Sequence, residues 1–215
     1  IAIPLFLLLI AELALRLAGV GTDTHYLQRH TFDNTTYFSP NRAFFDQFSS
    51  MPMGKIANWD CMEWLARPEK SPDTFRVILF GESAVYGTPY PEYGFPRYLR
   101  TMLATAYPDK QIEVINAACP GINTFTMQAV AHVLCPALKP DACVIYAGNN
   151  EGCMPYAPTT FIGGHDCLAR PAMVRAHIAL LGLRLTQLGL AAMQRTGAIE
   201  DAPLAYASGI PGETV

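Results

Sequence analysis

The sequence predicts an α/β fold in which helices cover both faces of a parallel sheet. Three observations predict it: short apolar runs with the character of buried strands, helical patterns between them, and connections long enough for crossover helices. Strand, helix, strand, helix and strand follow one another between residues 75 and 148. Such alternation is typical of right-handed βαβ units, and these build a sheet that is buried on both sides.

The strands are predicted from apolar runs without polar alternation. Residues 75–81, FRVILFG, are rich in β-branched and aromatic side chains and end in glycine, which is typical of a strand buried on both faces. QIEVINAA at 111–118 is the second strand, and DACVIYAG at 141–148 is the third. We expect the third strand to be as buried as the first.

The helices are predicted from apolar residues at a spacing of three and four. One pattern covers 94–108 and a second covers 122–139, where we expect an interruption near Pro136. A last helical pattern runs from 172 to 194. The tail at 196–215 has no regular pattern, and we expect it to be irregular.

Charge and composition exclude two broad classes of protein. The 215 residues carry 15 Lys and Arg against 18 Asp and Glu, which gives a formal net charge of -3. A nucleic-acid-binding protein would show a basic surface instead, so no nucleic-acid partner is expected. Hydrophobic residues make up 51% of the chain and charged residues 15%, a composition that forms a packed core and excludes disorder as the main state.

Residues 1–20 predict a transmembrane anchor helix. They are apolar except for Glu12 and Arg16, and about 20 helical residues cross the hydrocarbon layer of a membrane. The two charges are four residues apart, so they share one helical face and can pair there. A cleaved signal peptide and a buried core helix are the alternatives, and both fit less well. The lipid bilayer is therefore the first expected partner.

Residues 21–73 have a mixed composition without sustained periodicity. We interpret them as an extended arm with short elements that links the anchor to the α/β domain. Aromatic residues of the arm are expected to pack on that domain: Phe44, Phe45, Phe48, Trp59 and Trp64.

The cysteines give no sign of a metal or redox motif. The chain has six: Cys61, Cys119, Cys135, Cys143, Cys153 and Cys167. None forms a C-x-x-C pair, so zinc, thioredoxin-type and haem sites have no support, and no metal or cofactor is expected. Cys135 and Cys143 are interpreted as core residues, and a disulfide between Cys153 and Cys167 is a hypothesis for an oxidising compartment.

Three residue types suited to acyl transfer follow the three predicted strands. Ser83 follows the first strand, Gly121 the second and Asn150 the third. In an open parallel sheet, ligands bind outside the carboxyl ends of the strands. A serine hydroxyl there can attack an ester carbonyl when a base takes its proton, and backbone and side-chain amides can stabilise the resulting oxyanion.

The same residues carry a resemblance to a known family. GESA at 81–84, NAACPGINT at 116–124 and GNNE at 148–151 resemble the first three sequence blocks of the SGNH/GDSL hydrolases. More closely, residues 74–193 resemble a bacterial membrane-anchored subgroup of that family. The resemblance implies a three-layer, flavodoxin-like α/β/α fold. It also implies a single-pass protein of the bacterial inner membrane, with the soluble domain on the periplasmic side.

The resemblance also assigns roles to the three residues. Ser83 would be the nucleophile, and the N–H groups of Ser83 and Gly121 with the Asn150 side chain would form the oxyanion hole. One family feature is absent from the sequence, because no Asp-x-x-His follows residue 151. His165 is the only local candidate for the base. Since only three of about five family strands are evident, we interpret 74–195 as a partial domain and expect a further C-terminal portion.

Two functions therefore remain open. One is a membrane-anchored serine esterase or acyl hydrolase that acts on an ester or acetylated substrate, with its catalytic Asp and His outside this chain. The other is a catalytically inactive, hydrolase-like accessory subunit that binds other subunits of a membrane complex. Dinucleotide and P-loop motifs are absent from the sequence.

Overall fold

The structure is a computed structural model that describes residues 2–48, 64–151 and 171–197. The chain divides into two compact units. One unit combines residues 1–22 with the segment that begins at Leu180, and the other runs from Asp23 to Ala179.

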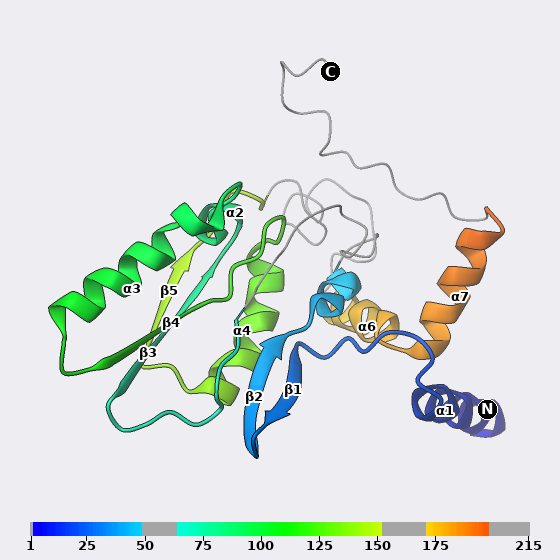
Figure 1. Ribbon diagram of the computed structural model, residues 1–215. Helices are drawn as coiled ribbons and strands as arrows, with labels where there is room; N and C mark the ends of the chain where they lie inside the picture. The colour runs from blue at the N-terminus through cyan, green and yellow to red at the C-terminus, as the bar shows by residue number, and fades with distance from the viewer. Residues whose placement is uncertain (1, 49–63, 152–170, 198–215) are drawn as a thin grey trace. The chain divides into compact units, whose positions relative to one another are not determined.

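The larger unit contains a parallel sheet of three strands in the order β4-β3-β5 (Figure 1). The strands are β3 (Thr74–Gly81), β4 (Gln111–Asn116) and β5 (Ala142–Tyr146). Val77 of β3 pairs with Val114 of β4 on one side and with Ala142 of β5 on the other. The three predicted strands and their parallel arrangement are thus confirmed.

The helices between the strands are also confirmed. The 94–108 pattern forms α3 (Phe95–Ala106), and the 122–139 pattern forms α4 (Thr124–Leu138). A short helix, α2 (Ser83–Tyr86), and the 3-10 turn η3 (Pro91–Tyr93) precede α3. The predicted interruption of the second helix is wrong, because Pro136 lies inside α4. This proline is exposed and stands two residues before the helix ends, so its missing N–H affects only the last turn.

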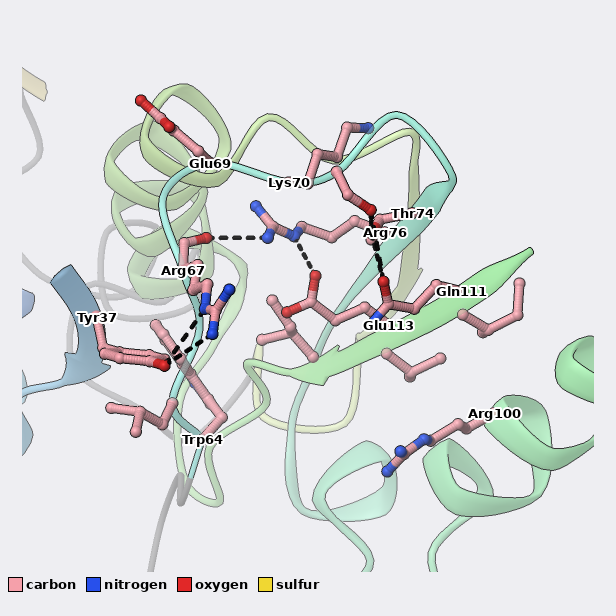
Figure 2. A pocket seen from close by; sticks show the side chains of 15 residues that line it. Tyr37, Trp64, Arg67, Glu69, Lys70, Thr74, Arg76, Arg100, Gln111 and Glu113 are labelled. Carbon is pink, nitrogen blue, oxygen red and sulfur yellow. Dashed lines mark hydrogen bonds and ion pairs between the residues drawn. The ribbon is translucent and has the colours of Figure 1, made fainter. Parts of the chain in front are cut away.

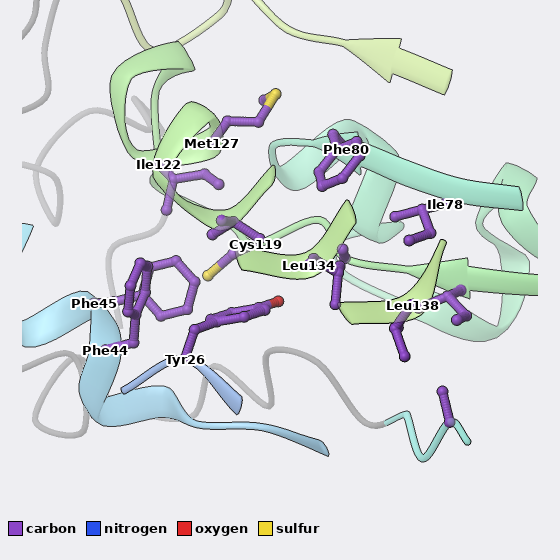
Figure 3. Packing of buried hydrophobic residues seen from close by; sticks show 14 of the residues in the cluster. Tyr26, Phe44, Phe45, Ile78, Phe80, Cys119, Ile122, Met127, Leu134 and Leu138 are labelled. Carbon is purple, nitrogen blue, oxygen red and sulfur yellow. The ribbon is translucent and has the colours of Figure 1, made fainter. Parts of the chain in front are cut away.

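Two hydrophobic clusters lie on the two faces of the sheet, which gives the predicted three layers. Ile78 and Phe80 of β3 pack in the larger cluster with side chains of α4 (Figure 3). Leu79, between them in the sequence, points to the opposite face and packs with Val85 and Leu99 of the α2–α3 layer. The α4 residues of the larger cluster repeat every three or four positions: Met127, Val130, Leu134 and Leu138.

The segment before the parallel sheet contains a hairpin that the sequence did not predict. Strands β1 (Leu27–Phe32) and β2 (Thr35–Pro40) pair antiparallel, with Phe32 opposite Thr35. The two residues of the turn, Asp33 and Asn34, have φ of 46° and 62°. A two-residue loop with positive φ at both positions suits the twist of a hairpin.

The aromatic packing of the arm is confirmed where the structure describes it. Phe44, Phe45 and Phe48 lie on or beside the 3-10 helix η1 (Arg42–Phe48) and are buried in the larger core cluster, with Trp64 packed against it. Figure 3 shows Tyr26 and the two adjacent phenylalanines around Cys119. Trp59 lies outside the described residues.

The third strand is not buried as the sequence predicted. Ile145 is 68% exposed and Tyr146 is 55% exposed. β5 is at the edge of the sheet, and no other strand of the described segments pairs with its outer side. The core assignment of Cys143 is wrong for the same reason, since this residue is exposed. Cys135 is partly buried against the core; burial, together with the neighbouring Cys143 thiol, raises its pKa to about 11.

The smaller unit contains α1 (Ala2–Leu17) and α7 (Arg184–Arg195). The expected ion pair on the first helix is present, with 2.8 Å between Arg16 Nε and Glu12 Oε1. The pattern predicted as one helix over 172–194 forms two, because α6 (Pro171–Leu181) ends three residues before α7 begins. Gly182 lies in the break, and glycine disfavours the helical interior.

The helices differ in whether their length and apolar composition suit membrane crossing. Within the described ranges, no single helix has both the length and the apolar character to cross a bilayer. A bent pair, Arg175–Leu181 with Arg184–Arg195, meets the requirement when taken together.

Candidate active site

The three predicted site residues lie on three loops at the carboxyl edge of the sheet. Ser83 is the first residue of α2, directly after β3, and is partly exposed. Gly121 lies in the loop after β4 with φ of 72°, a conformation that favours glycine. Asn150 follows β5 and is 6% exposed.

A buried carboxylate fixes the third loop to the residue before Ser83. Glu82 is fully buried, and its two carboxylate oxygens accept hydrogen bonds from the backbone N–H groups of Gly148 and Asn149, each at 3.0 Å. Hydrogen bonds to an ionised group are stronger than those between neutral groups. The loop that carries Asn150 is therefore held beside the loop that carries Ser83.

The second and third loops also bind each other. Asn150 donates a hydrogen bond from Nδ2 to the carbonyl of Ile122 at 2.8 Å, one residue after Gly121. The Glu151 carboxylate accepts from the backbone N–H of Thr124 at 2.7 Å and from its hydroxyl at 2.9 Å. The side chains of Asn150 and Glu151 therefore join the third loop to the loop that carries Gly121.

The start of α4 depends on the same contacts. Asn123 is the N-cap and accepts a hydrogen bond from the backbone N–H of Thr126 at 3.1 Å. Together with Glu151, it satisfies N–H groups that the first turn of a helix leaves without partners. The Asn-Thr pair before a helical pattern is an N-cap signal that the sequence contains. Glu151 has no local signal, because its partner Thr124 lies 27 residues earlier.

Backbone contacts attach the second loop to β3 and α2. The N–H of Cys119 donates to the carbonyl of Gly81 at 3.1 Å, and the Asn116 side chain donates to the carbonyl of Tyr86 at 3.4 Å. Gly81 itself leaves no room for a side chain, because a Cβ there would overlap Val85 and lie 2.8 Å from the Tyr146 carbonyl. The glycine of the GESA block therefore permits close packing of α2 on the sheet.

No described histidine lies on the three loops. The histidines that the structure describes lie on the arm or on helices: His25, His30, His132 and His177. His25 Nδ1 is 2.6 Å from Asp23 Oδ1, and both side chains are largely exposed. Within the described residues, Ser83 Oγ therefore has no histidine neighbour on its own loops. His165, the candidate base, and the Cys153–Cys167 pair lie outside the described residues.

A cavity of the larger unit lies away from these three loops. It has a volume of about 590 Å³ and is lined by the first residues of β3 and β4, Thr74 and Gln111, with Trp64 and Arg100 (Figure 2). This is the amino end of the sheet, and none of the three predicted site residues lines the cavity. Among the described residues, no group of three His, Cys, Asp or Glu side chains is placed to hold a metal ion.

Beside this cavity, a buried arginine joins several elements. Arg76 is 1% exposed; its Nε donates to Glu113 at 2.5 Å, and its guanidinium also donates to the carbonyls of Arg67 and Leu138. Figure 2 shows Arg76 between Arg67 and Glu113. Because its donors are used by protein acceptors, Arg76 serves the structure of the unit.

Comparison with known proteins returned structural likeness only. No family model and no curated protein matches the chain. Among solved structures, it is similar to TesA, with 20% identity, a TM-score of 0.34, and coverage of 55% of this chain and 55% of that chain. For a GDSL-like lipase from Parabacteroides merdae the identity is 17% and the TM-score 0.34, with coverage of 47% and 49%.

A third similar structure is AlinE4, an SGNH-hydrolase family esterase, with 22% identity, a TM-score of 0.33, and coverage of 59% of this chain and 57% of that chain. The chain spans about half the length of the solved structures it matches. The printed names of the second and third structures are those of a GDSL-like lipase and an SGNH-hydrolase esterase. The parallel sheet with helices on both faces agrees with the α/β fold class predicted from the sequence.

Proposed function

We propose that this chain is part of a membrane-anchored serine ester hydrolase of the SGNH/GDSL type, with Ser83 as its nucleophile. One observation carries the proposal: the side chains of Glu82, next to Ser83, and of Asn150 itself join the three loops by hydrogen bonds. Glu82 binds the loop of Asn150, and Asn150 binds the carbonyl that follows Gly121. A shell built in this way would hold an oxyanion site in position before the substrate arrives.

The proposed reaction follows from these positions. Ser83 Oγ attacks the carbonyl carbon of an ester or acetyl group while a base takes its proton. The carbonyl oxygen becomes an oxyanion, which accepts hydrogen bonds from the N–H groups of Ser83 and Gly121 and from the Asn150 side chain. The alcohol leaves with the proton, and water then releases the acid from the acyl-serine. The base is a histidine outside the described residues.

The proposal places the enzyme at the bacterial inner membrane, with the α/β unit on the periplasmic side. The exposed apolar side chains of α1 support this placement at the membrane, and they include Leu7 at 59% and Leu9 at 62%. Exposed leucines in succession around a helix are suited to lipid contact. Glu12 is buried and paired with Arg16, so the charges of this helix do not oppose the assignment.

A fluorophosphonate probe on the full-length protein tests the proposed nucleophile. We expect covalent labelling of the wild type and none of Ser83→Ala. Ser71→Ala is the matched control, because it removes an exposed hydroxyl before β3, away from the three loops, and it should label like the wild type. Labelling that persists in Ser83→Ala would refute Ser83 as the nucleophile. A folded wild type that does not label would refute the enzyme and favour the accessory subunit.

A further inference from the structure

The smaller unit is held together by a carboxylate of the first helix. Glu12 lies on α1 and is only 9% exposed. Its oxygens accept hydrogen bonds from the backbone N–H groups of Arg184 and Leu185, each at 3.0 Å, and from Arg16 Nε at 2.8 Å. The first two N–H groups of α7 are therefore capped by a side chain from another helix.

This contact explains how an apolar helix can carry an acidic residue. The residue before α7, Leu183, provides no side-chain cap, so the helix begins with donors that need an acceptor. A carboxylate near the N-terminus of a helix also interacts favourably with the helix dipole. In return, Glu12 obtains three donors, and such pairing is what an ionised group near lipid requires.

Three further hydrogen bonds join residues 16–22 to residues 182–187. Arg16 donates to the carbonyl of Gly182 at 3.3 Å, and Gln187 accepts from the N–H of Thr22 at 2.8 Å and donates to its carbonyl at 3.2 Å. α7 is thus attached to α1 and to the residues that follow it. In Figure 1, α1 is seen close to end-on and α7 from the side, so the two helices cross.

The position of Glu12 along α1 sets the depth of this contact. Glu12 precedes Leu17, the last residue of α1, by five residues. At 1.5 Å per residue, the start of α7 lies about 7.5 Å from the end of the anchor helix. Amphipathic helices in the membrane interface bury their apolar face by about 5–10 Å. With Leu17 at the bilayer surface, the start of α7 would lie within this depth.

Residues 180–195 carry exposed apolar side chains. The large ones in this range are Leu180 at 52%, Leu188 at 42%, Leu190 at 36% and Met193 at 45%. The bent helix pair that contains them meets the apolar composition of a membrane segment. Exposed apolar residues on a helix that crosses an anchor are suited to the boundary between headgroups and acyl chains.

We propose that residues 180–195 form a second membrane-contacting element, which lies in the bilayer interface and is docked on α1 through Glu12. The proposal rests on the proposed anchoring by α1. Its partner is a phospholipid bilayer, and the α/β unit is then held at the membrane from two points of the chain. The residues involved are separate from the proposed nucleophile and oxyanion site.

Photo-crosslinking to lipid tests the proposal on the full chain in phosphatidylcholine and phosphatidylglycerol vesicles. A benzophenone residue replaces Leu188 on α7, Leu7 on α1 as the anchor position, or Tyr98, which is 58% exposed on α3, as the control. We expect lipid adducts at positions 7 and 188 and about tenfold fewer at position 98. Adducts at 7 with only the control level at 188 would overturn the proposal while leaving the anchor intact.

A change at Glu12 separates docking from anchoring. Glu12→Leu removes the cap of α7 but makes α1 more apolar. We therefore expect the protein still to float with the vesicles. The lipid adducts at position 188 should fall several-fold, because α7 is no longer docked on α1. Ala14→Leu is the matched control, because it adds the same side chain at an exposed position of α1. Unchanged adducts at 188 in Glu12→Leu would refute docking through this residue. Failure of the wild type to float would refute both membrane proposals, and labelling of Ser83 would be unaffected.

Discussion

The Glu82 carboxylate provides the sharpest test of the loop arrangement. Glu82→Gln keeps the size of the side chain but removes its charge and replaces one acceptor oxygen by the NH2 of an amide. That NH2 would face a backbone N–H of Gly148 or Asn149, both of which donate to the carboxylate in the wild type. One hydrogen bond is therefore lost, the other is weakened, and a buried donor is left without a partner.

The magnitude follows from these two bonds. A hydrogen bond to a charged group contributes about 1.5–3 kcal/mol to stability, and an unsatisfied buried donor costs about 1–3 kcal/mol. Glutamine retains one acceptor, so we expect the free energy of unfolding to fall by about 2–4 kcal/mol. With a urea m-value of about 2 kcal/mol/M, the unfolding midpoint should fall by about 1–2 M.

Urea titration followed by tryptophan fluorescence measures this change, since Trp64 packs against the core of the same unit. Glu92→Gln is the matched control, because it removes the same charge from an exposed side chain on η3 and should leave the midpoint within about 0.3 M. The labelling of Ser83 by the fluorophosphonate probe should also fall in Glu82→Gln. A midpoint equal to that of the control would refute the conclusion that Glu82 holds the third loop.

Three further changes test the larger unit, each by its urea midpoint. Arg76→Met should lower the free energy of unfolding by about 3 kcal/mol, the lower end for a broken buried pair, because Glu113 is 30% exposed. Phe45→Ala should lower it by about 3–5 kcal/mol if the arm belongs to the core. The side-chain hydrogen bond from Lys70, with the backbone N–H of Arg76, lowers the pKa of Asp141. The ionised Asp141 therefore stabilises the fold at neutral pH, and this stabilisation is lost on acidification. Asp141→Asn should lower the free energy of unfolding at pH 7 and have little effect near pH 2. Equal effects at the two pH values would contradict the stabilising role of the Asp141 carboxylate.

The sheet and its helices could be predicted because their signals are local. FRVILFG at 75–81 is a strand wherever it lies in the sheet, and the spacing of Phe95, Leu99 and Met102 forms a helix independently of its partners. The exposure of Ile145 could not be predicted in this way. It depends on strand order, which places β5 at the edge, and the apolar run at 141–148 contains no information on its neighbours.

The candidate site shows the same division. The positions of Ser83, Gly121 and Asn150 after the strands follow from the local pattern. The roles of Glu82 and Glu151 do not, because their partners lie 66 and 27 residues away and are backbone groups, whose sequence carries no chemical signature. The hairpin at 27–40 was also missed, because its strands lack apolar alternation and its turn uses Asp-Asn.

Among the described strands, none pairs with the outer edge of β5, and this has a practical consequence for anyone who purifies this segment. A strand edge with unpaired backbone groups and exposed apolar side chains is a template for aggregation. On β5 the exposed apolar side chains are Ile145 and Tyr146. Natural proteins protect such margins with lysine, so Ile145→Lys is the substitution with which to begin making the segment soluble enough to crystallise.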